Sequence, residues 1–434
     1  MLGVWIASGV IGGLLLITFV YGLAIRSMYR EKLRTDEVYL VSTQDEWKLR
    51  VCRYRRGRTL GEPVLLCHGA GANHHNFSFP GNDSLIDFLV AKGYDCWAVD
   101  LRGCRSSQPP DGKKRFDAKL DDYLLQDLPA VIEHIRRVTG YHTMHWIGHS
   151  LGGLLLYAYA REFGVRGLAG CVTLGAPIGF DGTHVAAPDF LVRFFARHPR
   201  FVTALAHAYV PIGRTLHLPL GFFPISLRNL HPNITTEHLF LMLDNLLPDV
   251  FVTLADWARG KKCVMKGGAL DVKAGLAALR APLLVFLAPR DPFVSLEYGW
   301  RFFDALPTRD KQMIVLGKDH GCIEDYNHVE MPFSRAARQE VFMPIAAWLA
   351  AHPAHRLATE RRDANGRLVG VAALAPHERL GVLSGSSFER LTQREQDTPT
   401  TDAPRLEQAE TPSEMDTPDE AADPAATRES SPDA

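Results

Sequence analysis

The segment whose residue types and spacing point most directly to chemistry is Gly148-His149-Ser150-Leu151-Gly152. It fits the pattern G-x-S-x-G, in which a sharp turn between a strand and a helix exposes a serine hydroxyl above a sheet. The context agrees, because a short apolar run (144–147) precedes the motif and a helical pattern (154–163) follows it. The flanking glycines avoid the crowding that a Cβ would cause. We therefore predict that Ser150 is a nucleophile.

A serine nucleophile needs a histidine to accept its proton and a carboxylate to orient that histidine. In folds that use this serine motif, the three groups follow one another in the order Ser, Asp, His. Asp291 comes shortly after the apolar run 281–287, and two histidines, His320 and His328, lie beyond the next expected strand. Chain order alone leaves either histidine as the base.

Apolar runs of strand length alternate with helical patterns along most of the chain, which indicates a mostly parallel sheet with helices on both faces. The expected strands are 37–41, 47–54, 63–67, 96–100, 144–147, 168–174, 281–287 and 312–316. The expected helices are 85–90, 120–139, 154–163, 296–306 and 335–351. Between about 176 and 280 the alternation breaks, and we expect an inserted, largely helical cap there.

These features together resemble the α/β-hydrolase superfamily, and in particular its lipase-like and esterase-like members with an inserted cap. The resemblance covers roughly residues 37–355. It depends on matching motifs in the family's order, which are His68-Gly69-Ala70 after the third strand, the serine motif at 148–152, Asp291, and a histidine in the loop 318–333. The fold that it implies is a mostly parallel eight-stranded α/β sheet with a helical cap.

The resemblance also implies roles for individual residues. The backbone amides of Ala70 and Leu151 would form the oxyanion hole, and Asp291 would be the acid of the triad. The sequence Tyr-Asn-His-Val-Glu around His328 is similar to the histidine segment of acid-lipase-like relatives, which favours His328 over His320 as the base.

The implied function is that of a serine hydrolase that cleaves carboxylic ester bonds through an acyl-enzyme, with no cofactor and no metal. Phenylalanines are frequent in the expected cap, and they favour a hydrophobic acyl-ester or lipid substrate. They are Phe180, Phe190, Phe194, Phe195, Phe201, Phe222 and Phe223. Two other functions stay open, namely an acyltransferase that uses the same triad and a catalytically dead binding module tethered to a membrane.

Residues 1–25 contain no charged side chain and are long enough to cross a bilayer core of about 30 Å as a helix. A basic linker (26–36) follows, with Arg26, Arg30, Lys32 and Arg34. Positive charges after the segment and none before it predict a single-pass, uncleaved anchor with the catalytic domain in the cytoplasm. The alternative is a signal peptide that is removed after export.

The formal net charge of -1 is the sum of two opposed parts of the chain. From Gly385 onward there are 13 Asp and Glu against 4 Arg and no Lys, so the tail carries -9 and the rest carries +8. We expect residues 356–434 to be poorly ordered, with an acidic disordered tail from 385. Basic residues elsewhere are scattered without an aromatic-basic stripe, so we expect no nucleic-acid partner.

The seven cysteines include no C-x-x-C pair, which favours reduced thiols over disulfides or a structural zinc. His74 and His75 are adjacent, and we expect them to line a pocket entrance or to face solvent rather than to bind a metal.

Overall fold

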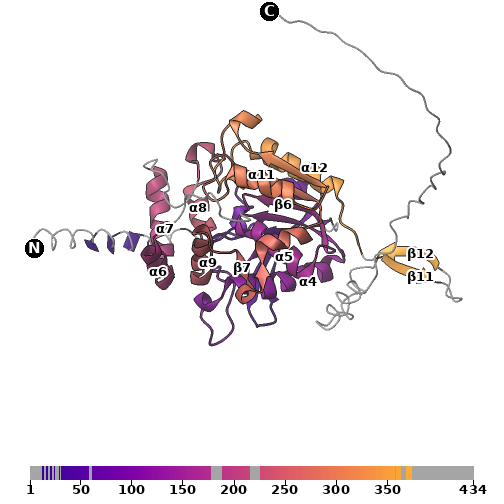
Figure 1. The fold of residues 1–434 in the computed structure, drawn as a ribbon, viewed down its shortest axis with the longest axis horizontal. Coiled ribbons are helices and arrows are strands. Elements are labelled where there is room, and N and C mark those ends of the chain that lie inside the picture. The colour runs from indigo at the N-terminus through magenta and orange to yellow at the C-terminus, as the bar shows by residue number, and fades with distance from the viewer. Residues whose placement is uncertain are drawn as a thin grey trace, which may run out of the picture. The chain divides into compact units, whose positions relative to one another are not determined.

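An eight-stranded sheet forms the centre of the computed structural model (Figure 1). The structure describes residues 31–57, 61–176, 188–215, 225–356, 358–362 and 368–373, and scattered positions between 12 and 29. The strands of the sheet lie in the order β1-β2-β4-β3-β5-β6-β9-β10. Neighbours from β4 to β10 are parallel, whereas β1 and β2 are antiparallel. The strands are β1 (Glu37–Ser42), β2 (Lys48–Tyr54), β3 (Pro63–Cys67), β4 (Asp95–Asp100), β5 (Met144–His149), β6 (Leu168–Leu174), β9 (Leu283–Leu287) and β10 (Lys311–Val315). The predicted mostly parallel sheet is thus confirmed.

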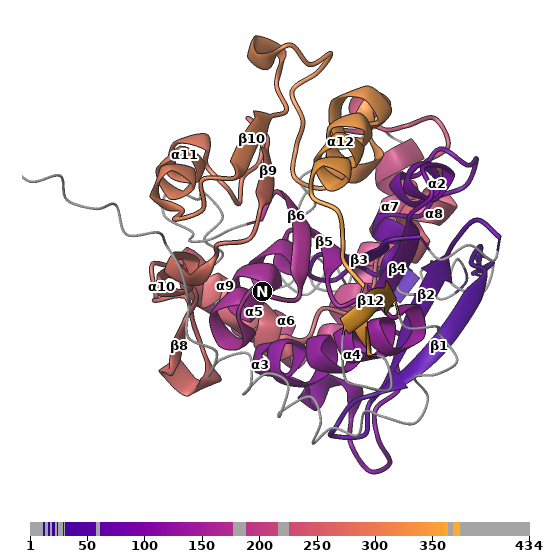
Figure 2. The same cartoon turned by 90° about the vertical axis from the view of Figure 1, so that its right-hand side faces the viewer.

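Helices cover both faces of this sheet (Figure 2). On one face lie α4 (Leu128–Thr139), α5 (Leu151–Phe163) and α11 (Leu296–Ala305), and on the other lie α2 (Leu85–Ala91) and α12 (Met343–Ala351). Successive side chains of β3 point to opposite faces of the sheet. Leu65 packs in the hydrophobic core under α4, α5 and α11, and Leu66 packs in the core under α2 and α12. A strand that is buried on both sides has to be hydrophobic at successive positions.

Two long helices predicted from the sequence are interrupted by π-helical turns. The segment 120–139 consists of α3 (Leu120–Asp122), a π turn (Tyr123–Asp127) and α4, and a second π turn (Arg338–Phe342) precedes α12. In both cases a proline, Pro129 or Pro344, lies in the first turn of the following helix. Proline lacks an N–H and its ring collides with the carbonyl four residues earlier, so the preceding turn widens.

The stretch between β6 and β9, where the sequence alternation breaks, is largely helical in its described parts. It contains α6 (Asp189–Arg197), α7 (Pro199–Thr215), α8 (Thr236–Met242), α9 (Pro248–Ala258) and α10 (Val272–Gly275) and a two-stranded hairpin of β7 (Val264–Met265) and β8 (Leu270–Asp271). Residues 177–187 and 216–224, and with them Phe180, Phe222 and Phe223, lie outside the described residues.

Most of the predicted anchor (1–25) and the whole tail from 385 lie outside the described residues. Among the positions that are described, no helix combines the length and the hydrophobicity needed to cross a bilayer. Within 356–384, for which the sequence predicts no regular element, β11 (Ala358–Arg362) and β12 (Leu368–Ala373) pair as an antiparallel hairpin.

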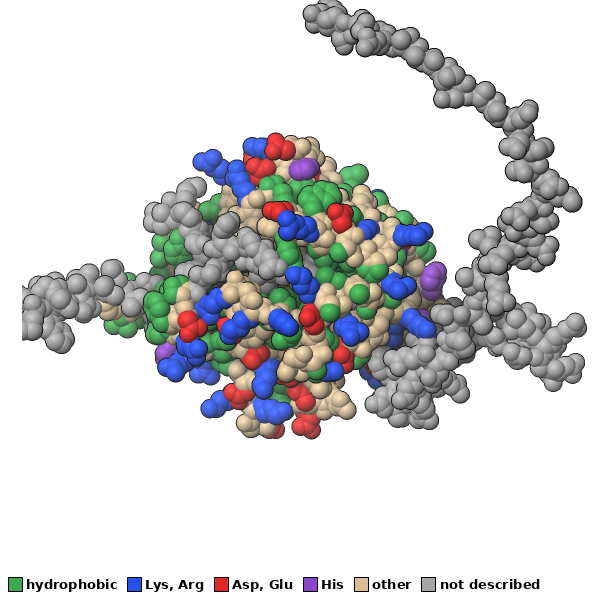
Figure 3. Space-filling model, viewed as in Figure 1, with side chains coloured by type: hydrophobic (Ala, Val, Ile, Leu, Met, Phe, Trp, Pro, Cys, Tyr) green, Lys and Arg blue, Asp and Glu red, His purple; other side chains and the backbone are tan. Residues whose placement is uncertain are grey.

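Figure 3 shows basic and acidic side chains interspersed over the described part of one face, without a gathering of either sign.

Candidate active site

Ser150 lies on the turn that joins β5 to α5, with φ 52° and ψ -117°. Positive φ is rare for a residue with a side chain, and this strained conformation lifts the half-buried Ser150 above the end of the strand. The turn is possible only with glycines beside it. A Cβ on Gly152 would lie 2.0 Å from the carbonyl oxygen of Cys67, and one on Gly148 would lie 2.4 Å from that of Gly152.

His328 lies between Ser150 and Asp291 in the structure. Its Nε2 is 2.8 Å from Ser150 Oγ, and its Nδ1 is 2.7 Å from Asp291 Oδ2. The carboxylate fixes the proton on Nδ1, which leaves Nε2 free to accept the serine proton. Both His328 and Asp291 are buried, and the ring of Phe293 packs edge-on against the imidazole at 4.8 Å.

Asp291 is itself held in place by backbone groups. Its Oδ1 accepts hydrogen bonds from the amides of Phe293 (2.8 Å) and Val294 (3.2 Å), so Oδ2 is left to face His328. Gly175, after β6, makes room for the pair, because a Cβ there would lie 3.0 Å from Asp291 Oδ2 and 3.1 Å from His328 Nδ1. The sequence analysis did not identify Gly175.

The other candidate base, His320, is exposed and ends a short 3-10 turn (Lys318–His320) after β10. The structure thus brings His328, and not His320, into contact with Ser150 and Asp291.

The segment predicted to form the oxyanion hole runs directly past Ser150. A Cβ on Gly69 would lie 3.2 Å from Ser150 Cβ, and the next residue, Ala70, is exposed. Leu151 is the first residue of α5, so its amide lies at the positive end of a helix.

Buried polar side chains hold the loop after β3 in place. His68 Nδ1 contacts the carbonyl oxygen of Gly69 at 2.7 Å, and His68 Nε2 accepts from the amide of Leu101 at 3.2 Å. Asp100, at the end of β4, accepts from the amide of His74 at 2.7 Å. The loop is thus held by buried groups that make no hydrogen bond to Ser150.

His149, the second residue of the serine motif, connects the loops on either side of Ser150. Its Nδ1 lies 2.9 Å from Asn76 Oδ1, which also accepts from the amide of Gly69, and its Nε2 lies 3.0 Å from the carbonyl oxygen of His328. Burial and the nearby His328 imidazole lower the pKa of His149 to about 3. The ring is therefore neutral at neutral pH. No pattern in the sequence indicates this role, although His149 lies within the motif.

Glu330 supports the loop that carries His328. Its carboxylate is fully buried and accepts hydrogen bonds from the amides of Asn327 (2.7 Å) and Ser226 (3.1 Å), which joins the histidine loop to the segment between β6 and β9. Burial raises the pKa of Glu330 to about 7. This contact spans more than 100 positions of the chain, so no local pattern indicates it.

Glu31, His74 and His75 are the one set of potential metal ligands gathered within 4.8 Å in the described part of the chain. Both oxygens of Glu31 are already engaged, however, by Arg50 Nη1 (2.8 Å) and Nη2 (2.7 Å). Both histidines line a pocket, which agrees with the first of the two predicted placements, and His74 is buried rather than exposed to solvent.

Comparison with known proteins agrees with this architecture. A family described as the alpha/beta hydrolase fold matches residues 62–326. Lipase 1 of Drosophila melanogaster is 36% identical over 123 residues, which are 27% of this chain and 28% of the lipase. Human gastric triacylglycerol lipase is 34% identical over 129 residues, 27% of this chain and 32% of the lipase. The matched segments thus span about a third of these two relatives.

A solved esterase from Exiguobacterium antarcticum superimposes with a TM-score of 0.51 at 16% identity and covers 72% of this chain and 100% of its own. At this identity the likeness shows the fold alone.

Proposed function

The chain belongs to the alpha/beta hydrolase fold family, and we propose that it is a serine hydrolase that cleaves carboxylic ester bonds of lipids or other acyl esters. The observation that carries this proposal is the line of two hydrogen bonds from Ser150 Oγ through His328 to Asp291. A histidine that contacts a strained, half-buried serine on one side and a buried carboxylate on the other has the geometry of a general base.

In the proposed reaction, His328 Nε2 takes the proton of Ser150 as its oxygen attacks the ester carbonyl carbon. The amides of Ala70 and Leu151 stabilise the negative charge that develops on the carbonyl oxygen. Asp291 stabilises the imidazolium. As the tetrahedral intermediate collapses, His328 returns the proton to the leaving alcohol, and an acyl-serine remains.

A water molecule then completes the cycle. His328 removes its proton while the oxygen attacks the acyl-serine, and the collapse of the second intermediate releases a carboxylic acid and restores Ser150. Every proton in this sequence moves between water, substrate and side chains of the chain, so the reaction requires no cofactor.

A lipid substrate is supported by two observations. The relatives that match part of this chain include proteins named as triacylglycerol lipases. On the cap, Phe190 and Phe194 of α6 are 70% and 45% exposed, and such large apolar side chains on a surface are suited to contact an acyl chain.

We further propose that residues 1–25 anchor the protein in a membrane with its catalytic domain in the cytoplasm, on the basis of the charge distribution around them. Intact mass measurement of the membrane-bound protein tests this proposal. A full-length N-terminus is expected, and a chain shortened within the first thirty or so residues would indicate an export signal instead.

Labelling with a fluorophosphonate tests the catalytic proposal. We expect a covalent adduct that peptide mapping assigns to Ser150, and no adduct in Ser150→Ala, which should remain as stable as wild type. Ester turnover that persists in Ser150→Ala would contradict the proposed nucleophile. A wild-type protein that is folded, detergent-activated and still unlabelled would favour the binding-module alternative, although the hydrogen-bonded distances given above argue against it.

A further inference from the structure

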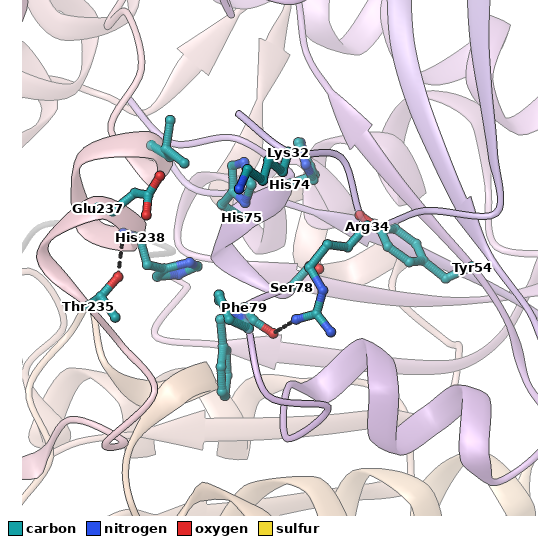
Figure 4. A pocket seen from close by; sticks show the side chains of 12 residues that line it. Lys32, Arg34, Tyr54, His74, His75, Ser78, Phe79, Thr235, Glu237 and His238 are labelled. Carbon is teal, nitrogen blue, oxygen red and sulfur yellow. Dashed lines mark hydrogen bonds between the residues drawn. The ribbon is translucent and has the colours of Figure 1, made fainter. Parts of the chain in front are cut away.

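A pocket of about 260 Å³ lies apart from the catalytic residues, between the linker that precedes β1, the loop after β3 and cap helix α8. Neither Ser150 nor His328 nor Asp291 lines it. Figure 4 shows that Lys32 and Arg34 enter it from the linker, His75 and Phe79 from the loop, and His238 from α8. Three separate segments of the chain therefore present polar side chains to one space.

His238 is the most informative of these side chains. It is 3% exposed, yet its Nε2 has no hydrogen-bond partner among the described residues. In Figure 4 its ring points into the pocket, toward His75 and Phe79. A buried polar atom without a partner is costly, and native proteins rarely retain one unless a ligand or water satisfies it. His238 Nε2 is therefore available to bind a polar group that enters the pocket.

The charge around His238 is mainly positive. Neither Lys32 nor Arg34 has a carboxylate within ion-pair distance in the part of the chain that the structure describes. Hydrogen bonds to Phe79 O (3.1 Å) and Asn82 Oδ1 (2.8 Å) hold the Arg34 guanidinium against the pocket wall. Glu237 is the one acidic residue in the lining, so the lining carries an excess of one positive charge before any imidazole is protonated.

A further cation lies close to the pocket. Arg214 of α7 has a buried Nη1 without a partner among the described residues, and it is near enough to His238 to affect the titration of that imidazole. Burial lowers the pKa of His238 well below its ordinary value. The imidazoles of His75 and His74 and the charge of Arg214 lower it further, and they outweigh the backbone of His75, which raises it. A bound anion would reverse this effect, because it would compensate these positive charges and allow His238 to protonate and donate.

We propose that this pocket binds a phosphate group, with Lys32 and Arg34 pairing with its charge and His238 Nε2 donating to one of its oxygens. A phosphate presents three or more acceptor oxygens, which suits donors that converge from three segments better than the two oxygens of a carboxylate. The headgroup of a phosphate-bearing lipid and free inorganic phosphate share this chemistry.

The position of the pocket favours the lipid. Lys32 and Arg34 belong to the basic linker that follows the proposed membrane anchor, so the pocket would open near the bilayer surface, where basic residues meet anionic headgroups. Phe79, Pro80 and Leu241 add an apolar wall that could contact the glycerol and the first methylenes of such a lipid. The choice of a lipid rests on the proposed anchor, whereas the phosphate site does not.

The test uses the full-length chain in a neutral detergent and two probes, inorganic phosphate and a short-chain ether-linked analogue of phosphatidic acid. The ether probe contains no carboxylic ester, so its binding does not depend on the proposed hydrolase activity. Calorimetry would compare wild type with Lys32→Ala/Arg34→Ala and with the charge-matched control Lys113→Ala/Lys114→Ala, whose two lysines are exposed far along the chain. Thermal unfolding would verify that all three proteins are folded.

We expect the double variant at the pocket to bind the ether probe at least about tenfold more weakly than wild type, and the control to bind as wild type does. Tighter binding of the ether probe than of inorganic phosphate would identify a lipid headgroup, and equal binding would identify free phosphate. Equal affinity of wild type and the pocket variant, or no binding of either probe at millimolar concentration, would overturn the proposal.

A second readout follows His238 itself. Phosphate should raise the pKa of its imidazole in an NMR titration, with His238→Gln used to assign the signal. An imidazole that titrates identically with and without phosphate would contradict the proposed contact.

Discussion

Two histidine-aspartate pairs are buried in the described part of the chain, and in one of them the histidine also contacts a serine. In the first pair His328 Nδ1 lies 2.7 Å from Asp291, and in the second His74 Nδ1 lies 3.1 Å from Asp100. The pairs differ at the other ring nitrogen. His328 Nε2 faces the hydroxyl of Ser150, whereas His74 Nε2 lies 3.6 Å from Glu31, a carboxylate that Arg50 already holds.

The surroundings of the two carboxylates differ as well. Asp291 receives two backbone amides and one imidazole, so its single negative charge remains available to stabilise an imidazolium. Asp100 is in a salt bridge with Arg50 at 2.7 Å. Burial alone would raise the pKa of Asp100, but His74 and Arg50 outweigh this effect and hold that pKa well below its ordinary value. A histidine-aspartate pair therefore supports catalysis only where its second nitrogen meets a nucleophile and no arginine neutralises the acid.

The largest expected effect comes from removing the base. His328→Ala should lower kcat for an ester substrate by about 10⁴-fold to 10⁶-fold, because no other group can then accept the serine proton. The matched control is His320→Ala, in the same loop but exposed, which should keep nearly all of its turnover. The reverse pattern in steady-state kinetics would transfer the role of base to His320.

Replacing each aspartate by asparagine should separate catalysis from stability. Asp291→Asn should lower kcat by about 10⁴-fold, because the amide can stabilise the wrong tautomer of His328, while the amides of Phe293 and Val294 still find an oxygen. The free energy of unfolding should change little. Turnover assays and urea unfolding on the same preparation measure both quantities.

Asp100→Asn should show the opposite behaviour. It leaves Arg50 with one carboxylate partner, the partly exposed Glu31. Losing one member of a buried ion pair costs about 3 kcal/mol or more of stability. The folded fraction should keep most of its turnover, since Asp100 does not touch Ser150 or His328. A severe loss of kcat in fully folded Asp100→Asn would show that the comparison of the two pairs is wrong.

Much of the fold and of the candidate site could be predicted from the sequence, because the patterns that indicate them are local. The serine motif, the glycines around it and the alternation of apolar runs with helical patterns are local, so the mostly parallel sheet and the position of Ser150 follow from neighbouring residues. Chain order together with the family resemblance predicts Asp291 and His328, and the structure brings His328 into contact with both Ser150 and Asp291. The prolines that widen two helical turns, Pro129 and Pro344, were visible in the sequence but were not used.

The rest depends on contacts between distant segments. His74 meets Asp100 because β4 lies beside β3, and Glu330 meets Ser226 because the segment between β6 and β9 reaches the histidine loop. Neither pairing has a periodicity or a spacing that a single sequence reveals. For the same reason the sequence does not show that His74, which lines a pocket as predicted, is also buried.

Glu330 allows a test by pH, because burial raises its pKa from 4.5 to about 7 in the folded protein. As the pH rises from 4.5 to 7, the unfolded chain releases this proton while the folded protein retains it. Stability should therefore fall across this window by about 3 kcal/mol on account of Glu330 alone. Buried His149 acts in the opposite direction, because its pKa is lowered from 6.5 to about 3 in the folded protein. Its contribution to the stability of the folded state increases as the pH rises from about 3 to 6.5.

A difference measurement isolates the contribution of Glu330. Urea unfolding of wild type and Glu330→Gln at several pH values should give free energies whose difference changes by about 3 kcal/mol between pH 4.5 and 7.5, in favour of the variant at the higher pH. Other titrating groups cancel in this difference. Two parallel curves would mean that the Glu330 carboxylate titrates as an exposed one does.

The smallest expected effect concerns Glu31, the second partner of Arg50. Burial alone would raise the pKa of Glu31, but hydrogen bonds from His75 and Arg50 outweigh it and hold that pKa well below its ordinary value. The resulting stability is present above pH 4.5 and is lost as the pH falls below it. Because the Glu31 side chain is 30% exposed, solvent screens the interaction, and Glu31→Gln should cost less than about 1 kcal/mol at pH 7.

The loss of stability in Glu31→Gln is informative when it is compared with the loss in Asp100→Asn. Both variants remove one carboxylate from Arg50, but only Asp100 is fully buried, so the ratio of the two losses reports how strongly burial amplifies an ion pair at one arginine. Glu297→Gln, which breaks an exposed pair with Arg301, sets the baseline for a surface contact. Equal losses for Glu31→Gln and Asp100→Asn in urea unfolding at pH 7 would mean that Arg50 depends on both partners alike, and the second histidine-aspartate pair would then not be the buried anchor that its geometry indicates.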